Sequence, residues 1–236
     1  MSTILLFILG TCLGSFYCLA AERIPRGESI LFPTSHCSHC FQKLRFFEMV
    51  PLLSITFQRF QCRYCSKKIP FIYLLSELAG GMICVLCFFE GVYAAPFHSF
   101  LLLSMGGLLS LTDIFYLIVE PKLLLFLTFI LFIWHLCFSL PLYYFTGLII
   151  FILLTILNRL FNQAIGGGDI LLLSCWGLLL GMNVILFIVF IASSSALIYA
   201  LVYPLFYHKK IKQIPFIPFL FWGLLLHIIL TNLKLS

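Results

Sequence analysis

Charged side chains are scarce in this 236-residue chain, in which Asp, Glu, Lys and Arg together make up only 9% of the residues. A soluble domain carries roughly 25% charged residues, so this chain has too few to cover a water-facing surface. The deficit excludes a soluble enzyme, a soluble nucleic-acid-binding protein and a disordered regulator. Hydrophobic residues make up 63% of the chain, with 27 Phe among them. The sequence therefore predicts a protein that lies in a lipid bilayer.

Polar stretches are also few, and apolar runs of span length fill most of the chain. A transmembrane helix needs about 20 apolar residues, and these runs are too long and too uniformly apolar for the strands of a membrane β-barrel. No internal repeat is evident. We expect an all-α polytopic membrane protein with eight helices, near residues 3–21, 72–93, 97–119, 122–140, 142–158, 168–182, 184–205 and 215–232.

The basic residues predict how these helices are oriented. If the N-terminus faces outward, thirteen of the fourteen Lys and Arg fall in four inside segments, residues 22–71, 120–122, 159–167 and 206–214. Because Lys and Arg concentrate in cytoplasmic loops, the net charge of +6 is a topology signal and does not indicate a nucleic-acid partner. No basic residue precedes the first apolar run, so we expect residues 1–21 to be a retained span and not a signal peptide.

Residues 22–71 form one long polar stretch, which carries eight of the basic residues. The composition changes sharply at both of its ends. We therefore predict three parts in a multi-pass protein of the cytoplasmic membrane: a first transmembrane helix at 1–21, a small cytoplasmic domain at 22–71 and a membrane-embedded bundle at 72–236.

Two Cys-x-x-Cys pairs lie in the predicted cytoplasmic domain, Cys37 with Cys40 and Cys62 with Cys65. Stable disulfides are disfavoured in the cytoplasm, whereas two such pairs at this separation are typical of a four-Cys zinc ribbon. Four thiolates leave no open coordination position, so we interpret the site as structural zinc; a redox thiol pair is the alternative. The other six Cys lie in expected spans, where a free Cys packs as a small apolar residue: Cys12, Cys18, Cys84, Cys87, Cys137 and Cys175.

Aspartate occurs only twice, as Asp113 and Asp169, and both lie in or against apolar runs. An ionisable residue in a span is costly and indicates function by default. In the predicted topology Asp113 lies about two helical turns from the cytoplasmic end of its helix, and Asp169 enters the membrane from the same face, so the two carboxylates can meet at similar depth. Two structural alternatives stay open: Asp169 is a helix N-cap, and Asp113 bonds a neighbouring helix or pairs with Arg159 or Lys122.

A close pair of carboxylates shares one proton, because both cannot ionise cheaply. The ionised member can take a proton from water while the protonated member donates to a carbonyl oxygen, which is the chemistry of an aspartic peptidase. Gly166, Gly167 and Gly168 directly precede Asp169 and would let the backbone approach a substrate strand. A phosphate-binding loop is the competing interpretation, but its Lys is absent.

These features together resemble the type IV prepilin peptidases, which are membrane aspartic proteases with a Gly-x-Gly-Asp motif. The Gly-Ser-Phe run at 14–16 and the Arg-Ile-Pro run at 23–25 are similar to the amino-terminal motif of the family. The paired Cys knuckles look like its zinc domain, and residues 73–78 look like the segment that enters its second helix. Asp113 and Asp169 match its catalytic pair. The short chain is most like the competence-pilus members of Gram-positive bacteria.

The resemblance implies cleavage of a basic leader from prepilins or pseudopilins at the cytoplasmic membrane face, often followed by N-methylation with S-adenosylmethionine. It also suggests that Glu77 positions the substrate amine or the methyl donor, with an interhelical hydrogen bond as the alternative. The chain departs from the family pattern at Cys18, where Asn is usual, and at Pro121, which stands one position late. Phe60 and Gln61 replace residues associated with methyl transfer, which leaves that second activity open.

Three other functions compete with prepilin cleavage. A non-enzymatic membrane scaffold of pilus assembly would use the zinc domain for docking and would tolerate Asn at both Asp positions. A proton-coupled transporter would need further polar residues at the midplane and in the outer half, and the sequence has few. A related Gly-x-Gly-Asp peptidase with other membrane substrates would not explain the cytoplasmic Cys domain.

Overall fold

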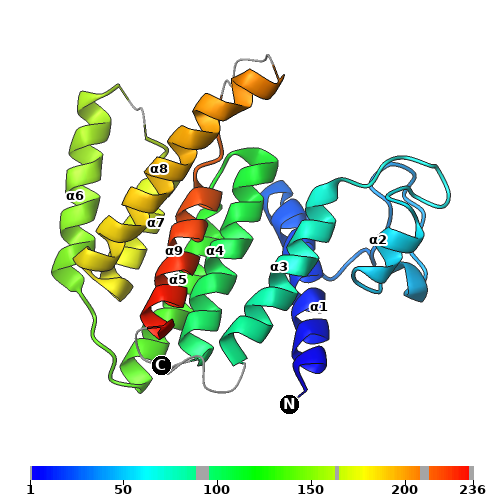
Figure 1. Cartoon of the computed structure of the whole chain (residues 1–236), viewed down its shortest axis with the longest axis horizontal. Coiled ribbons are helices and arrows are strands. Elements are labelled where there is room, and N and C mark those ends of the chain that lie inside the picture. Colours follow the sequence, from blue (N-terminus) through cyan, green and yellow to red (C-terminus); the bar gives the residue numbers. More distant parts are fainter. Residues whose placement is uncertain (1, 89–95, 163–164, 208–212, 234–236) are drawn as a thin grey trace. The chain divides into compact units, whose positions relative to one another are not determined.

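The computed structural model describes residues 2–88, 96–162, 165–207 and 213–233. Within these ranges the regular structure is helical, with two isolated β-bridges in the Cys-rich segment (Figure 1). The helices are α1 (Thr3–Arg23), α2 (Leu53–Phe57), α3 (Phe71–Phe88), α4 (Pro96–Tyr116), α5 (Pro121–Cys137), α6 (Tyr144–Leu160), α7 (Gly167–Leu180), α8 (Met182–Tyr207) and α9 (Ile217–Leu233), with 3-10 turns η1 (Ile24–Arg26) and η2 (Phe46–Glu48).

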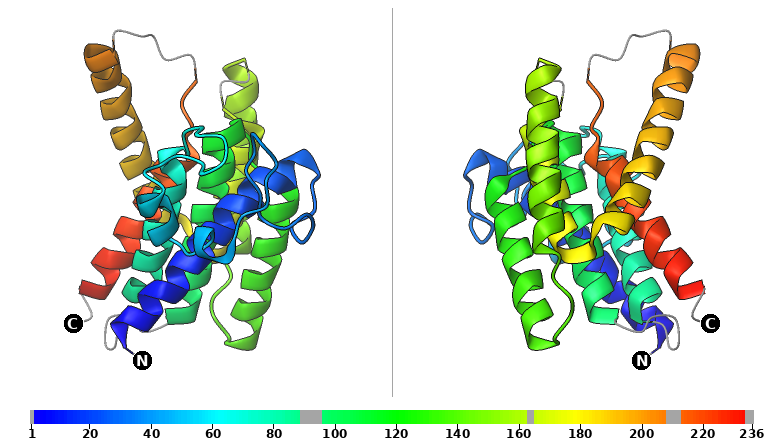
Figure 2. Two further views of the ribbon diagram at one scale, coloured as in Figure 1. Left: turned by 90° about the vertical axis from the view of Figure 1, so that its right-hand side faces the viewer. Right: turned by 90° about the vertical axis from the view of Figure 1, so that its left-hand side faces the viewer.

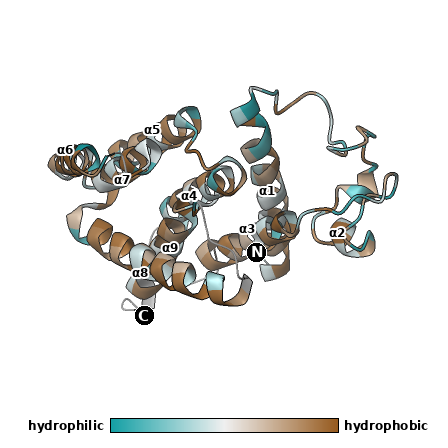
Figure 3. Cartoon of the chain, turned by 90° about the horizontal axis from the view of Figure 1, so that it is seen from above, coloured by the Kyte–Doolittle hydropathy of each residue, from teal (hydrophilic) through white to brown (hydrophobic). Residues whose placement is uncertain are grey.

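All eight segments expected to be apolar helices contain a helix in the described residues, which confirms the all-α class. Most of their residues have hydrophobic colours in the ribbon of Figure 3. By length and composition, however, only α1, α3, α4 and α8 of the described helices are sufficient to cross a membrane. The helices α5, α6, α7 and α9 are apolar but have only 14 to 17 residues. Eight membrane spans therefore remain a prediction.

The chain divides into two compact units, Met1–Phe100 and Leu101–Ser236, here called unit 1 and unit 2. In unit 1, α1 packs on α3 with direct contact between the two backbones. A Cβ atom added to Gly14 would overlap the carbonyl oxygen of Ser76, and one added to Gly10 would lie 2.7 Å from the Cα of Gly81. Close approach through small residues four positions apart is a common way for membrane helices to associate.

Replacing Gly14 by Ala is expected to destabilise unit 1 by about 1–3 kcal/mol, because the new methyl group must push α1 away from the backbone of α3. The matched control is Gly107→Ala in α4, where the added Cβ would find its nearest neighbour, a ring carbon of Phe221, at 4.0 Å. Thermal unfolding of both variants in the same detergent measures the effect. Equal melting temperatures for the two variants would contradict this account of the helix pair.

In unit 2, glycines again mark the positions where helices approach closely. A Cβ on Gly177 of α7 would lie 2.6 Å from the side chain of Ile150 in α6. A Cβ on Gly223 of α9 would lie 2.8 Å from the carbonyl oxygen of Ile188 in α8. Figure 2 shows α8 (orange) and α9 (red) from two sides. The indole of Trp176 in α7 is fully buried. The contact of Gly177 and the burial of Trp176 hold α7 in place, and its first turn carries Asp169.

Candidate active site and metal centre

Asp113 lies on α4 and is buried, with 7% of its surface exposed. Its Oδ2 atom accepts a hydrogen bond of 2.9 Å from the N–H of Ile217, the first residue of α9. The first N–H groups of a helix lack partners within the helix, and the Asp113 carboxylate accepts a hydrogen bond from one of them. Asp113 therefore does bond a neighbouring helix, and its expected alternative partners Arg159 and Lys122 form no ion pair with it in the described structure.

The depth of Asp113 differs from the expected two turns. The helix α4 ends at Tyr116, three residues after Asp113, so the carboxylate lies one turn from the end. Leu117 stops the helix because its backbone adopts the left-handed conformation, with φ of 56°. Its N–H still donates to the carbonyl oxygen of Asp113, at 2.9 Å.

Asp169 lies in the first turn of α7 and is half-buried. It is not the N-cap: that position belongs to Gly166, and no side chain caps the helix. The carboxylate of Asp169 instead folds back toward Gly166, so that a Cβ on that glycine would lie 3.1 Å from Oδ2. The carboxylates of Asp113 and Asp169 are near enough to repel each other electrostatically. Unit 2 thus brings its two Asp side chains, from α4 and α7, together.

The glycines before Asp169 have three different environments. Gly168 lies directly against the side chain of Val119, in the loop after α4, and leaves no room for a Cβ atom. Gly167 faces open space, because a Cβ atom added to it would have no neighbour within 4 Å in the described structure. The contact between Gly168 and Val119 holds the start of α7 beside the loop that follows Asp113. Gly168 therefore positions the second carboxylate against the first.

The four Cys of residues 22–71, here called the loop domain, converge in unit 1. Their sulfur atoms lie within 4.8 Å of one another, with Cys37 to Cys65 at 3.8 Å and Cys40 to Cys62 at 4.0 Å. Four thiolates at the usual Zn–S bond length of about 2.3 Å would be roughly 3.8 Å apart in a tetrahedron. The donor set and its spacing therefore fit a tetrahedral metal ion.

Both knuckles have the same backbone pattern, at an offset of 25 residues. The bridge between His36 and Lys43 recurs between Gln61 and Lys68, and it closes each Cys-x-x-Cys turn. This recurrence is local to the two knuckles, where only a few identical residues mark it. In the first knuckle burial alone would raise the pKa of Cys37, but N–H groups of Cys40 and His39 donate to its sulfur and lower the pKa to about 7. These bonds favour the thiolate that a metal requires.

Comparison with known proteins decides the family. The model of the bacterial peptidase A24 N-terminal domain matches residues 8–90, and that of the type IV leader peptidase family matches residues 100–201. The prepilin leader peptidase/N-methyltransferase of Bacillus subtilis (strain 168) is 31% identical over 186 residues, which cover 77% of this chain and 75% of that protein. This chain belongs to the type IV prepilin leader peptidase family. It is an aspartic peptidase of the membrane.

Other relatives of the peptidase carry the same name. That of Vibrio cholerae (serotype O1, strain ATCC 39315 / El Tor Inaba N16961) is 29% identical over 217 residues, covering 83% of this chain and 84% of the relative. That of Myxococcus xanthus (strain DK1622) is 39% identical over 84 residues, covering 36% of this chain and 25% of the relative. No solved structure matches the chain significantly.

Glu77 of the peptidase lies in unit 1 and is buried in α3. Its Oε2 accepts a hydrogen bond of 2.7 Å from the N–H of Leu52, and the hydroxyl of Ser15 in α1 also donates to its carboxylate. Leu52 has an unusual backbone conformation, with φ of 63°. Glu77 therefore links α1, α3 and the start of α2, which supports the alternative of an interhelical hydrogen bond; its contact with a substrate stays a prediction.

Two residues of the site in unit 2 were not expected from the sequence. Ile217 contributes only its backbone N–H to Asp113, and Val119 contributes only its shape against Gly168. The Pro at position 218 signals a helix start near Ile217, but nothing in the sequence shows which carboxylate that start faces.

Proposed function

We propose that the peptidase cleaves the leader from a prepilin or pseudopilin at the cytoplasmic face of the membrane, with Asp113 and Asp169 as its catalytic pair. The observation that supports this most is the approach of the two carboxylates to each other, one at the end of α4 and one at the start of α7. Both ends face the cytoplasm in the orientation with the N-terminus outside and residues 22–71 inside, which is part of the proposal.

In the proposed reaction the two carboxyl groups have different tasks. The N–H of Ile217 stabilises the anion of Asp113, so Asp113 takes a proton from the attacking water. Asp169 then holds the shared proton and donates it to the oxygen of the scissile carbonyl. The water oxygen bonds to the carbonyl carbon. As that intermediate collapses, Asp113 gives the proton it took to the amide nitrogen, Asp169 takes back the proton of the hydroxyl group, and the C–N bond breaks to release the leader and the new amino terminus.

The substrate backbone is proposed to pass over the open side of the glycine run. Gly167 has free space beside it, and Gly166 is exposed next to the Asp169 carboxylate. A strand-like leader junction could therefore approach the catalytic pair without a side chain in between. Glu77 is retained as a candidate contact for the substrate amine.

A four-Cys site for structural zinc is the second part of the proposal. Cys37, Cys40, Cys62 and Cys65 would hold the ion, and its binding would add folding free energy to a domain of about fifty residues that is too small for a sizeable core. The closed sulfur set leaves no position for water or substrate. The zinc is proposed to act on the stability of the domain and not on the peptide bond.

Methyl transfer is named in the relatives, and S-adenosylmethionine would be its donor. In this chain the two residues that depart from the family pattern at the positions associated with methyl transfer have structural contacts. Phe60 stacks on Phe71, with ring centroids 6.0 Å apart, and Gln61 forms the bridge with Lys68. We therefore propose leader cleavage as the primary activity. The mass of the cleaved product decides whether methylation follows.

Co-expression with a pseudopilin from the same organism tests the proposal. Mass spectrometry of the membrane fraction should show loss of the leader only when the peptidase is present, and a product heavier by one methyl group would establish methylation. An intact pseudopilin in the membrane beside abundant peptidase would contradict the proposal and favour a scaffold.

Gly168→Ala is expected to lower the cleavage rate by about a hundredfold, because its methyl group meets Val119 and displaces Asp169 from Asp113. The matched control is Gly167→Ala, which adds the same methyl group one residue earlier into open space and should keep most of the activity. Initial rates of leader loss at equal membrane abundance compare the two. A larger loss in Gly167→Ala than in Gly168→Ala would refute the positioning role of Gly168.

A further inference from the structure

We propose that the loop domain of unit 1 inserts an aromatic surface into the headgroup region of an anionic bilayer. This interfacial surface consists of apolar side chains of η2, α2 and the residue after η2: Phe46, Phe47, Met49, Leu53 and Phe57. The proposal rests on α1 and α3 lying in the membrane and is independent of the proposed cleavage.

The Phe rings of the interfacial surface are strongly exposed. Phe47 and Phe57 are 83% and 82% exposed, and both line one shallow cavity of about 530 Å³ between η2 and α2. The ring of Phe46 lies 6.1 Å from that of Phe47 in an edge-to-face arrangement. The three exposed Phe rings of this surface would add to the aggregation hazard of so small a domain in water, which indicates that something apolar covers them.

The depth of the domain identifies the bilayer as the cover. Leu52, directly before α2, is hydrogen-bonded to Glu77, six residues into α3. At 1.5 Å per residue, this point lies about 9 Å from the start of α3. Figure 1 likewise shows α2 level with α3 and not beyond its N-terminal end. Because α3 is long and apolar enough to span a membrane, the domain lies at the level of the boundary between headgroups and acyl chains.

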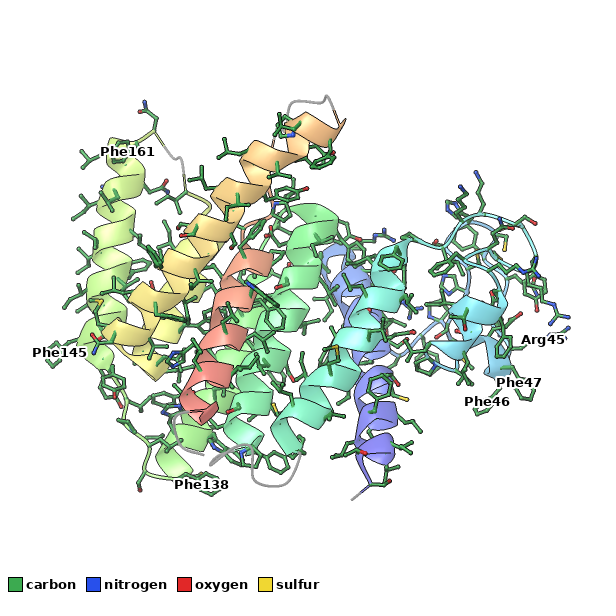
Figure 4. The ribbon with its side chains drawn as sticks, viewed as in Figure 1. Arg45, Phe46, Phe47, Phe138, Phe145 and Phe161 are labelled. Atoms are coloured by element: carbon green, nitrogen blue, oxygen red, sulfur yellow. The ribbon has the colours of Figure 1, made fainter. Side chains whose placement is uncertain are left out.

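The charge of the domain fits the same partner. Residues 22–71 contain eight Lys and Arg but only three Glu and no Asp. Arg45 precedes the interfacial surface, and its side chain projects outward beside Phe46 and Phe47 in Figure 4. Arg63 lines the cavity that Phe47 and Phe57 share. Basic side chains flanking exposed aromatic ones are typical of segments that lie in the plane of an anionic leaflet.

Labelling by lipid tests the proposal on the full chain. The peptidase is reconstituted in nanodiscs of phosphatidylcholine, with or without phosphatidylglycerol, that contain a phospholipid with a diazirine near the top of its acyl chain. After irradiation, mass spectrometry should find lipid adducts on residues 44–58, with more adducts when phosphatidylglycerol is present. The variant Phe46→Ser/Phe47→Ser should reduce these adducts about tenfold.

Phe41→Ser is the matched control, since Phe41 is also exposed but stacks on His36 in the first knuckle. It should leave the adducts on residues 44–58 unchanged, and the metal content of each variant reports whether the domain has folded. Absence of adducts on residues 44–58 of the parent chain would overturn the proposal. Shielding of this segment that depends on protein concentration and not on lipid would also overturn it and favour a second copy of the chain. The measurement needs no substrate, so failed cleavage does not affect it.

Discussion

Replacing either Asp113 or Asp169 by Asn is expected to abolish leader cleavage, with a fall in rate of about 10²–10⁴-fold or more. Asn keeps the size of Asp, and its carbonyl oxygen at position 113 can still accept the hydrogen bond from Ile217. What it loses is the ability to take up and release a proton at the working pH. The amide should therefore preserve the junction of α4 and α9 and remove only the chemistry, as measured by mass spectrometry of the co-expressed pseudopilin.

Glu120→Gln makes the same carboxyl-to-amide change in the loop after α4, where Glu120 is the N-cap position of α5 but forms no side-chain cap. This control should cleave at nearly the parental rate. Membrane abundance of all three variants must match that of the parent chain. If either Asn variant retained cleavage near the parental rate, the catalytic pair would be refuted, and a scaffold or another pair of residues would have to be considered.

Much of the peptidase could be predicted because its strongest signals are local. The helices follow from runs of apolar residues, and the four-Cys cluster follows from the spacing of Cys37, Cys40, Cys62 and Cys65. The approach of Asp113 to Asp169 was predicted from topology alone, because both helices were expected to meet the same membrane face. Their catalytic roles stay a prediction.

The remaining features depend on partners that are distant in the sequence. Gly10 and Gly14 stand four residues apart in an apolar segment, which is a recognised contact pattern, but only the structure shows that they meet the backbone of α3. The end of α4 at Tyr116 depends on a left-handed Leu117, a conformation that Leu rarely adopts. The bond from Leu52 to Glu77 likewise joins a loop conformation to a helix, and neither residue predicts it alone.

Replacing Cys62 by Ser is expected to release the metal and unfold most of the loop domain. Cys62 is the most buried of the four Cys. Its N–H donates to the carbonyl oxygen of Lys67 and its carbonyl oxygen accepts from the N–H of Ser66, so both groups close the second knuckle. Structural zinc contributes about 10–16 kcal/mol to small zinc domains, more than a domain of this size can replace. The zinc content should fall from one ion per chain to nearly none, and hydrogen exchange across residues 34–70 should become fast.

The unfolding that follows the loss of zinc should not extend into α1 and α3, because these helices are joined by backbone contacts at Gly14 and Gly80 that do not involve the knuckles. Exchange in α1 and α3 should therefore stay slow in Cys62→Ser, as it should in the control Cys137→Ser, which changes an exposed Cys at the end of α5. Full zinc content in Cys62→Ser would refute the four-Cys site. Fast exchange in α1 as well would show that the metal stabilises the whole of unit 1, and the loop domain could then not be regarded as a separately stabilised part.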